Sequence, residues 1–181
     1  LTATALYQFQ YTSYGPDGSS FNYARNAIVP ELYFQAMYKK GGFQVGAGVD
    51  LLTIKPRQKF EHNGATYKCK EDPVVSVSPT VFASYKNGNW GVKGRFTYAQ
   101  NAAHLSMISG YGVTNIDANG EQEYGTLNSV GGWVDVTYKQ PLKKGFLTFC
   151  CFAGYTKNSS GFPVKLNTGL SFLSSNIPVR L

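Results

Sequence analysis

The stretch ELYFQAMYKKGGFQVGAGVDL, residues 31–51, decides the fold class, because apolar side chains recur in it at every second position. A helix would need apolar residues three and four positions apart, whereas a half-buried β-strand alternates apolar and polar residues. Only the turn-like segment 39–42 separates the two alternating runs. The stretch therefore predicts an antiparallel hairpin whose apolar face carries Leu32, Phe34, Ala36, Tyr38, Phe43, Val45, Ala47, Val49 and Leu51.

The turn also predicts a register. Placing Tyr38 opposite Phe43 pairs apolar residues along one whole face of this hairpin. The next hairpin turns at Asn87-Gly88, a strong hairpin signal, and the same geometry places Tyr85 opposite Trp90. On the other face this register pairs Gln35 with Gly46, Glu31 with Asp50, Phe82 with Lys93 and Thr80 with Arg95.

Similar alternation recurs along the chain and predicts about eight strands of roughly 9–13 residues. Strands in globular proteins average about 5–6 residues, whereas tilted strands that cross a bilayer need about 9–11. Short and long connections alternate between the strands, as they do in outer-membrane barrels. Beyond the first hairpin, the predicted strands lie near 3–12, 74–86, 90–100, 129–138, 146–155 and 164–173, with long connections at 15–27, 55–73 and 101–128.

The composition agrees with a β-rich membrane wall. Aromatic residues make up 15% of the 181-residue chain, and charged residues also make up only 15%. Nowhere does an apolar run approach the ~18 residues that a transmembrane helix needs. The net charge of +7 comes from basic residues that stand singly or in pairs, so we expect no nucleic-acid binding.

An aromatic pair brackets every short turn. Aromatic rings with a polar tip favour the headgroup level of a bilayer, where they anchor membrane proteins. We therefore predict that one row of aromatic side chains marks the membrane interface at the turn end. Its members are Tyr38, Phe43, Tyr85, Trp90, Tyr138 and Phe146.

The opposite face of the same strands is polar. A lipid-facing Lys or Arg near the midplane costs about 2–4 kcal/mol, so we expect this face to line a wet lumen. Lys93 and Arg95 could favour anions, unless acidic residues balance them across the lumen. The predicted pore-lining residues are Glu31, Gln35, Asp50, Lys93, Arg95 and Asp135.

The third hairpin fits this scheme less well, because Trp133 and Phe152 fall on the inward side. Either a β-bulge or a lumen partly filled by aromatic rings would explain them. The adjacent Cys150 and Cys151 point to opposite faces of a strand and are poorly placed for a disulfide or a shared metal. Cys69 lies in a long connection, so we expect no metal site and no cofactor.

The two histidines, His62 and His104, fall in or beside long connections. A catalytic histidine needs a nucleophile and an orienting partner, and the sequence places neither, so we expect exposed loop residues and no enzymatic activity. Oxygen-bearing side chains cluster around Asn119-Gly120. Calcium prefers such ligands, but the twelve-residue calcium-loop pattern is absent. A polar turn is therefore predicted, with calcium as the alternative, over Asp117, Asn119, Glu121 and Glu123.

Three stretches in the second half of the chain carry a family resemblance. They are 104–107 with 110–113, the strand around Gly132-Trp133, and the heptapeptide FAGYTKN at 152–158. Together they resemble the porin-like outer-membrane β-barrels of the Bacteroidota. Such proteins are longer, so the resemblance implies that the chain is part of a larger barrel. It also implies passive diffusion of small hydrophilic solutes and a homotrimeric assembly.

These observations predict an all-β, single-domain chain over 1–181: a transmembrane up-and-down antiparallel β-barrel in the bacterial outer membrane. The expected function is a porin-like channel for small hydrophilic solutes, surrounded by outer-membrane lipid and lipopolysaccharide. Two alternatives stay open. One is a closed eight-stranded barrel with a structural or adhesive role. The other is a soluble lipocalin-like barrel whose apolar face points inward.

Overall fold

Long antiparallel strands dominate the computed structural model, which describes residues 1–7, 13–16, 18–20, 22–69, 73–105 and 107–159. Seven of the eight strands of the main sheet follow one hydrogen-bonded path that ends with β11 and β10. The eighth strand, β12, also pairs with β11. The eight strands are β1 (Thr2–Leu6), β4 (Glu31–Lys40), β5 (Phe43–Ile54), β8 (Val74–Asn87), β9 (Trp90–Gln100), β11 (Gln122–Leu142), β10 (Gly110–Ile116) and β12 (Gly145–Asn158).

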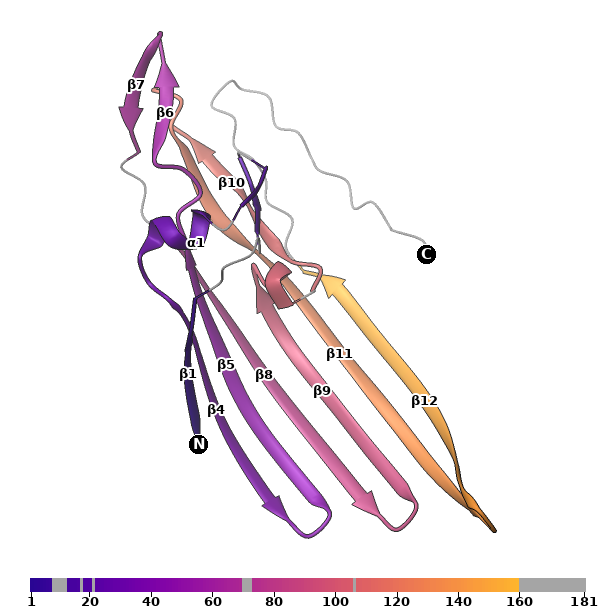
Figure 1. The fold of residues 1–181 in the computed structure, drawn as a ribbon. Helices are drawn as coiled ribbons and strands as arrows, with labels where there is room; N and C mark the ends of the chain where they lie inside the picture. The colour runs from indigo at the N-terminus through magenta and orange to yellow at the C-terminus, as the bar shows by residue number, and fades with distance from the viewer. Residues whose placement is uncertain (8–12, 17, 21, 70–72, 106, 160–181) are drawn as a thin grey trace.

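Smaller elements fill the long connections. Two short hairpins pair β2 (Ser13–Gly15) with β3 (Gly18–Ser20) and β6 (Lys59–His62) with β7 (Ala65–Lys68), while α1 spans Asn22–Ala27 and η1 spans Ala103–Leu105. Neither of these helices is long and apolar enough to cross a membrane. The three short turns lie together at one end of the sheet, and α1, β6, β7 and β10 lie at the other (Figure 1). The predicted alternation of short and long connections is confirmed over this part of the chain. The predicted strand at 164–173 and residues 8–12 of the one at 3–12 lie outside the described residues.

The first two turns are tighter than predicted, and the register moves with them. β4 continues to Lys40, which pairs with Phe43, so Tyr38 lies opposite Val45 and not opposite Phe43. In the second hairpin Asn87 pairs with Trp90, and Tyr85 lies opposite Val92. Gly41 and Gly88 adopt positive φ angles of 57° and 54° at these turns, a conformation that costs glycine little. Both registers are shifted by two residues, the period of the pleat, so every side chain keeps its predicted face.

The third hairpin corrects one predicted interface residue. β11 extends through Leu142, which pairs with Gly145, and the pairing runs without a register shift back to Ser129. Tyr138 therefore lies opposite Phe149, whereas Phe146 pairs with Pro141 on the other face. No bulge is present in this pairing, so Trp133 and Phe152 do lie on the same face as the predicted pore-lining residues.

The two faces of the sheet differ sharply in chemistry. One face, here called the apolar face, carries Phe34, Val81 and Phe96. It also carries the residues opposite them and every second residue along the paired strands. Among the paired positions that the structure describes, its charged residues are Lys40 and Lys157, both at strand ends. Its large side chains are open to the surroundings, with Val81 53% and Phe96 51% exposed. The apolar face is formed by Leu32, Phe34, Ala36, Tyr38, Phe43, Val45, Ala47, Val49, Leu51, Val75, Val77, Pro79, Val81, Ala83, Tyr85, Trp90, Val92, Gly94, Phe96, Tyr98, Val130, Gly132, Val134, Val136, Tyr138, Leu147, Phe149, Cys151, Ala153 and Tyr155.

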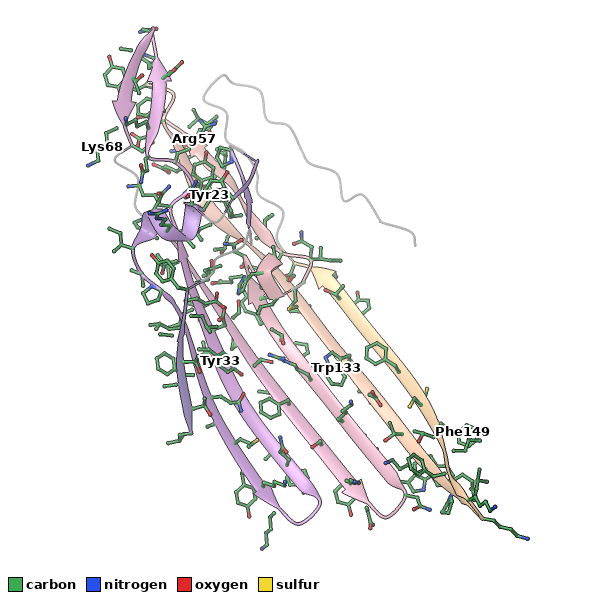
Figure 2. The ribbon with its side chains drawn as sticks, in the orientation of Figure 1. Tyr23, Tyr33, Arg57, Lys68, Trp133 and Phe149 are labelled. Carbon is green, nitrogen blue, oxygen red and sulfur yellow. The ribbon has the colours of Figure 1, made fainter. Side chains whose placement is uncertain are left out.

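The opposite side of the sheet, here called the polar face, carries the remaining charges of the long strands. Its glycines are covered by neighbouring rings: a Cβ at Gly48 would lie 2.6 Å from the Tyr33 hydroxyl oxygen, and one at Gly46 would meet the Phe82 ring. The Tyr33 hydroxyl donates a hydrogen bond of 2.8 Å to Gln35 Oε1. Trp133 lies midway along β11, and Tyr33 lies near the start of β4 (Figure 2). The polar face is therefore a mixture of charged, amide, hydroxyl and aromatic groups.

A small hydrophobic core lies at the loop end of the sheet. Tyr23 of α1 is buried against Leu52, Ile54 and Val74, which occupy polar-face positions at the ends of their strands. The Tyr23 hydroxyl donates to the Gly18 carbonyl at 2.9 Å, which links the core to the β2–β3 hairpin. The long connections are thus packed onto the sheet on its polar-face side.

The connection 101–128 is more ordered than a single long loop. Gln100 at the end of β9 pairs with Asn128, and Gly110 at the start of β10 pairs with Leu127, the next residue of β11. β10 therefore continues the pairing of β9 along β11, and residues 101–109 interrupt this pairing. Asn101 begins this interruption with a φ of 47°, a left-handed conformation that asparagine tolerates better than most residues. Residues 101–109 are called the excursion below.

Candidate functional site

All six predicted pore-lining residues lie on the polar face. Lys93 and Asp135 are directly opposite each other on β9 and β11, and their Nζ and Oδ2 atoms are 3.4 Å apart. The Lys93 side chain is 56% exposed and that of Asp135 21%. The Lys93 side chain is therefore hydrated, whereas Asp135 is partly buried, with its Oδ1 atom buried and without a partner among the described residues. Asp135 balances one of the two cations on β9. The remaining four of these residues are Glu31, Gln35, Asp50 and Arg95.

Arg95 is held by hydroxyl groups. Its Nε donates to Thr80 Oγ1 at 2.9 Å, and this oxygen is 2.9 Å from Thr97 Oγ1. In the described part of the chain no carboxylate lies within ion-pair distance of the Arg95 guanidinium. Arg95 therefore presents a positive charge on the polar face that acidic groups there do not neutralise.

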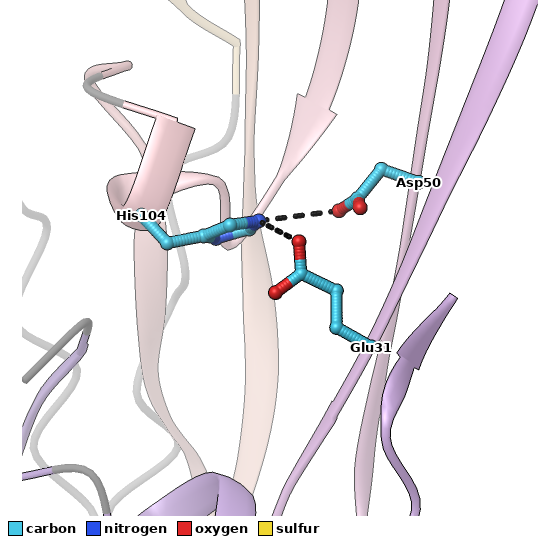
Figure 3. A group of neighbouring side chains, drawn as sticks. All are labelled: Glu31, Asp50 and His104. Atoms are coloured by element: carbon cyan, nitrogen blue, oxygen red, sulfur yellow. Dashed lines mark hydrogen bonds and ion pairs between the residues drawn. The ribbon is translucent and has the colours of Figure 1, made fainter. Parts of the chain in front are cut away.

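Glu31 and Asp50 have a cationic partner that the sequence did not reveal. The imidazole of His104, in η1 of the excursion, lies between the two carboxylates (Figure 3). Its Nε2 is 3.2 Å from Asp50 Oδ2 and 3.4 Å from Glu31 Oε1. The three side chains are only 3–6% exposed. His104 is therefore not the exposed loop residue that was predicted, because the excursion folds back onto the polar face.

The surroundings of His104 favour its charged form. Burial alone would lower the pKa of the imidazole, but the hydrogen bonds and negative charges of Asp50 and Glu31 outweigh it and raise the pKa to about 9. Two carboxylates on adjacent strands would repel each other if they were buried without a cation. A protonated His104 therefore attaches the excursion to β4 and β5 while it compensates this repulsion.

The same three residues could in principle hold a divalent cation, because their ligand atoms lie within 4.8 Å of one another. A metal-bound imidazole usually donates its second N–H to a carboxylate, a carbonyl or water. His104 Nδ1 is buried and has no hydrogen-bond partner among the described residues. The Nε2 atom is at hydrogen-bond distance from Asp50 Oδ2 and at ion-pair distance from Glu31 Oε1. The geometry therefore favours an ion-paired anchor over a metal centre.

The oxygen-rich cluster around Asn119-Gly120 is a polar turn. Asp117 Oδ1 accepts hydrogen bonds from the backbone N–H groups of Glu121 at 2.8 Å and Asn119 at 2.9 Å. These bonds, that from Glu121 first, lower the pKa of the exposed Asp117 carboxyl. The turn joins β10 to β11, as the pattern of turn residues predicted. The Asp117 carboxylate is thus used to close a hairpin.

Five of the six predicted interface aromatics lie on the apolar face, close to the turns. Phe43 lies directly opposite Tyr85, and the rings of Trp90 and Tyr138 are 4.7 Å apart. Phe149, near the turn end in Figure 2, continues this row opposite Tyr138. Phe146 lies on the polar face, where Lys139 Nζ is 4.9 Å from its ring centroid. The row also includes Tyr38.

Sequence reasoning missed the excursion and its histidine. The available signal was the placement of Glu31 and Asp50 on one face of adjacent strands, since two buried acids require a cation. The basic residues nearest to Glu31 and Asp50 in the sequence are Arg25 and Lys55. No local feature of the sequence indicates that His104 is the cation instead. Comparison with known proteins found no match: no protein-family model, no curated protein and no solved structure matches this chain.

Proposed function

We propose that this chain forms part of a porin-like β-barrel channel in the bacterial outer membrane and passes small hydrophilic solutes along its polar face. The observation that carries the proposal is the separation of charge between the two faces. Every charged residue in the paired interior of the long strands lies on the polar face, and the apolar face has lysines only at strand ends. Such a separation is required when one face contacts lipid tails and the other contacts water.

The exposed side chains of the apolar face must be shielded from water. This face extends over six long strands, from β4 to β12, and its side chains are packed against nothing in the described residues. Soluble monomers rarely expose a contiguous apolar patch of more than a few hundred Å². Lipid tails can cover such a face without a cost in polar desolvation where the backbone groups are paired on both sides, as they are in β5, β8 and β9.

The turn end has the composition of a membrane interface. The aromatic row of the apolar face is followed immediately by lysines at the turns, and no acidic residue occurs in segments 39–42, 86–89 or 139–145. Tyr and Trp rings favour the headgroup level, and lysines beside them can contact lipid phosphates. The lysines in or beside the turns are Lys39, Lys40, Lys86, Lys139, Lys143 and Lys144.

Strand lengths also fit a bilayer. Tilted strands need about 9–11 residues to cross the hydrocarbon core. β5 has 12 residues, β8 has 14, β9 has 11 and β12 has 14. The excursion, with Glu31, Asp50 and His104, then lies on the lumen side, where it narrows the path that a solute would take.

The test is single-channel recording of the full-length protein, extracted in detergent and inserted into planar bilayers. Stable conductance steps with a reproducible ion preference are expected. Insertion is checked separately, by protection of the long strands from protease in lipid vesicles. Protein that inserts but carries no current would replace the channel by a closed eight-stranded barrel with a structural or adhesive role.

Protein that stays in the aqueous phase and resists insertion would instead support the soluble, lipocalin-like alternative, in which the apolar face is internal. Cross-linking in the membrane examines the homotrimer. A trimer band at high dilution is expected, and a monomer band alone would remove that part of the proposal.

A further inference from the structure

We propose that the cavity beneath the excursion is a binding site for small organic anions that carry a planar apolar ring, such as an aromatic carboxylate. The cavity has a volume of about 530 Å³ and lies on the polar face between β9, β11, β12 and the side chains of Leu105, Met107 and Ile108. This volume is within the range of small-molecule sites, which combine an apolar lining with a few polar groups. The role of this site in solute passage rests on the proposed channel function, but binding itself does not.

The floor of the cavity is aromatic. The rings of Trp133 and Phe152 are 6.0 Å apart and inclined by 31°, and the Phe152 side chain is 66% exposed although it lies on the polar face. Gly131 and Gly154, beside them, have no side chains to fill the space above the sheet. Glycine within a strand often marks the close approach of a ligand. The exposed Phe152 ring and the half-buried Trp133 ring provide a surface on which a planar group can stack, beside the part of the floor where Met107 covers Gly131.

One wall of the cavity is positively charged. Arg95 lies directly opposite Trp133 in the register of β9 and β11 and lines the same cavity. Its Nε is bound to Thr80, and no carboxylate of the described residues pairs with it. An arginine held in this way can bind a carboxylate with its remaining N–H groups. The other cation on the strand, Lys93, is paired with Asp135 and does not line the cavity.

The roof is supplied by the excursion. Leu105, Met107 and Ile108 line the cavity from the side opposite the strands. Met107 reaches down to the sheet, since a Cβ placed on Gly131 would lie 2.9 Å from Met107 Cε. The ion pairs of His104 with Glu31 and Asp50 hold this roof in place. The cavity is therefore a defined space with an aromatic floor, an aliphatic roof and one unneutralised cation.

These features select the ligand class. A small inorganic anion would use Arg95 but leave the rings uncovered, and a neutral ring would cover them but leave the arginine without a partner. A ring with one carboxylate does both, and charge attraction in this partly enclosed space is screened less than in bulk water.

Tryptophan fluorescence provides the experiment, because the chain contains only two tryptophans. In full-length protein carrying Trp90→Phe, the emission of this chain reports on Trp133. Titration with benzoate in detergent is expected to give a saturable change in emission. Benzyl alcohol, which has the ring without the charge, and acetate, which has the charge without the ring, are each expected to bind at least about tenfold more weakly, a difference of about 1.4 kcal/mol.

Two substitutions in the Trp90→Phe background identify the site. Arg95→Gln is expected to weaken benzoate binding about tenfold, whereas the matched change Lys93→Gln should alter it less than about twofold. Phe152→Leu provides a second variant at an exposed position and should also weaken binding. Circular dichroism and heat-dependent gel mobility verify that each variant is folded.

The proposal is overturned if benzoate causes no saturable change, if benzyl alcohol binds as tightly as benzoate, or if Arg95→Gln and Lys93→Gln have equal effects. Because the titration requires no current, its outcome is independent of the bilayer recordings. Saturable benzoate binding by a barrel that does not conduct would uphold the site and contradict only the channel.

Discussion

His104 Nε2 lies 3.2 Å from Asp50 Oδ2, although 54 residues separate the two along the chain. This contact joins the excursion to a strand that is two strands away from β9 in the sheet. With Glu31 it forms a buried cluster of two carboxylates and one imidazole. The excursion is therefore attached to β4 and β5 through one ion-paired side chain.

Replacement of His104 by alanine should release the excursion. Breaking a buried ion pair by removal of one partner typically costs about 3–5 kcal/mol, because the other charges stay buried without compensation. The backbone N–H groups of Leu105 and Met107, which both bond to the Ala102 carbonyl, should lose protection from hydrogen exchange. His62→Ala, in the β6–β7 hairpin, is the matched control and should leave this protection unchanged. Equal exchange in wild type and His104→Ala would show that the ion pairs do not hold the excursion.

The anchor should weaken in alkaline solution. The pKa of His104 is raised from 6.5 to about 9 in the folded protein. A raised pKa means that the stabilisation is fully present below about pH 6.5 and is lost as the pH rises through about 9. Thermal unfolding of the wild type, measured from pH 6 to pH 10, should therefore show a drop in stability that His104→Gln lacks. If the two proteins follow parallel curves, His104 is not the group that titrates.

A charge on the apolar face should impair membrane insertion. Val81 lies in the middle of β8 on that face, and an arginine near the midplane of a bilayer costs about 2–4 kcal/mol. Val81→Arg should lower the free energy of folding into lipid vesicles by this amount, measured by urea titration. Gln44→Arg places the same charge on the polar face and should cost less than about 1 kcal/mol. Equal losses in the two variants would contradict the assignment of the faces.

Ion preference should depend on Arg95 more than on the Lys93–Asp135 pair. Lys93 is more than half exposed, so the contribution of the pair to stability should be about 0–1 kcal/mol. The double variant Lys93→Gln, Asp135→Asn removes no net charge and should keep the reversal potential of the wild type in a salt gradient. Arg95→Gln removes one unpaired positive charge and should shift the preference toward cations. A larger shift in the double variant than in Arg95→Gln would show that the pair sets the preference.

The faces of the sheet were predictable because alternation is a local property of the sequence. Phe34, Val45 and Val81 lie on the predicted face even though the first two hairpins are shifted by two residues, since a shift of two preserves the pleat. The third hairpin shows the limit of this reasoning. There β11 ends at Leu142, four residues beyond the predicted end, and the register that follows moves Phe146 to the polar face.

The candidate site was less predictable, because its contacts depend on the path of a connection. Glu31, Asp50 and Arg95 could be assigned to one face by counting residues. Nothing in the composition of segment 101–109 indicates that it folds onto that face or that His104 ends between two acids. The turn at Asp117, by contrast, was predictable, because its hydrogen bonds connect residues two and four positions apart.

The excursion interrupts a continuous pairing along β11, and it is therefore a place at which the protein can be altered. Gln100 and Gly110 pair with adjacent residues of β11, so the ends of the excursion meet at the spacing of neighbouring strand residues. A segment of another length can therefore be grafted between these two positions while the strand pairing on either side is kept, provided that it supplies a cation to Glu31 and Asp50. The sheet supplies a fixed frame, and the chemistry above its polar face can be changed in a single exchangeable segment.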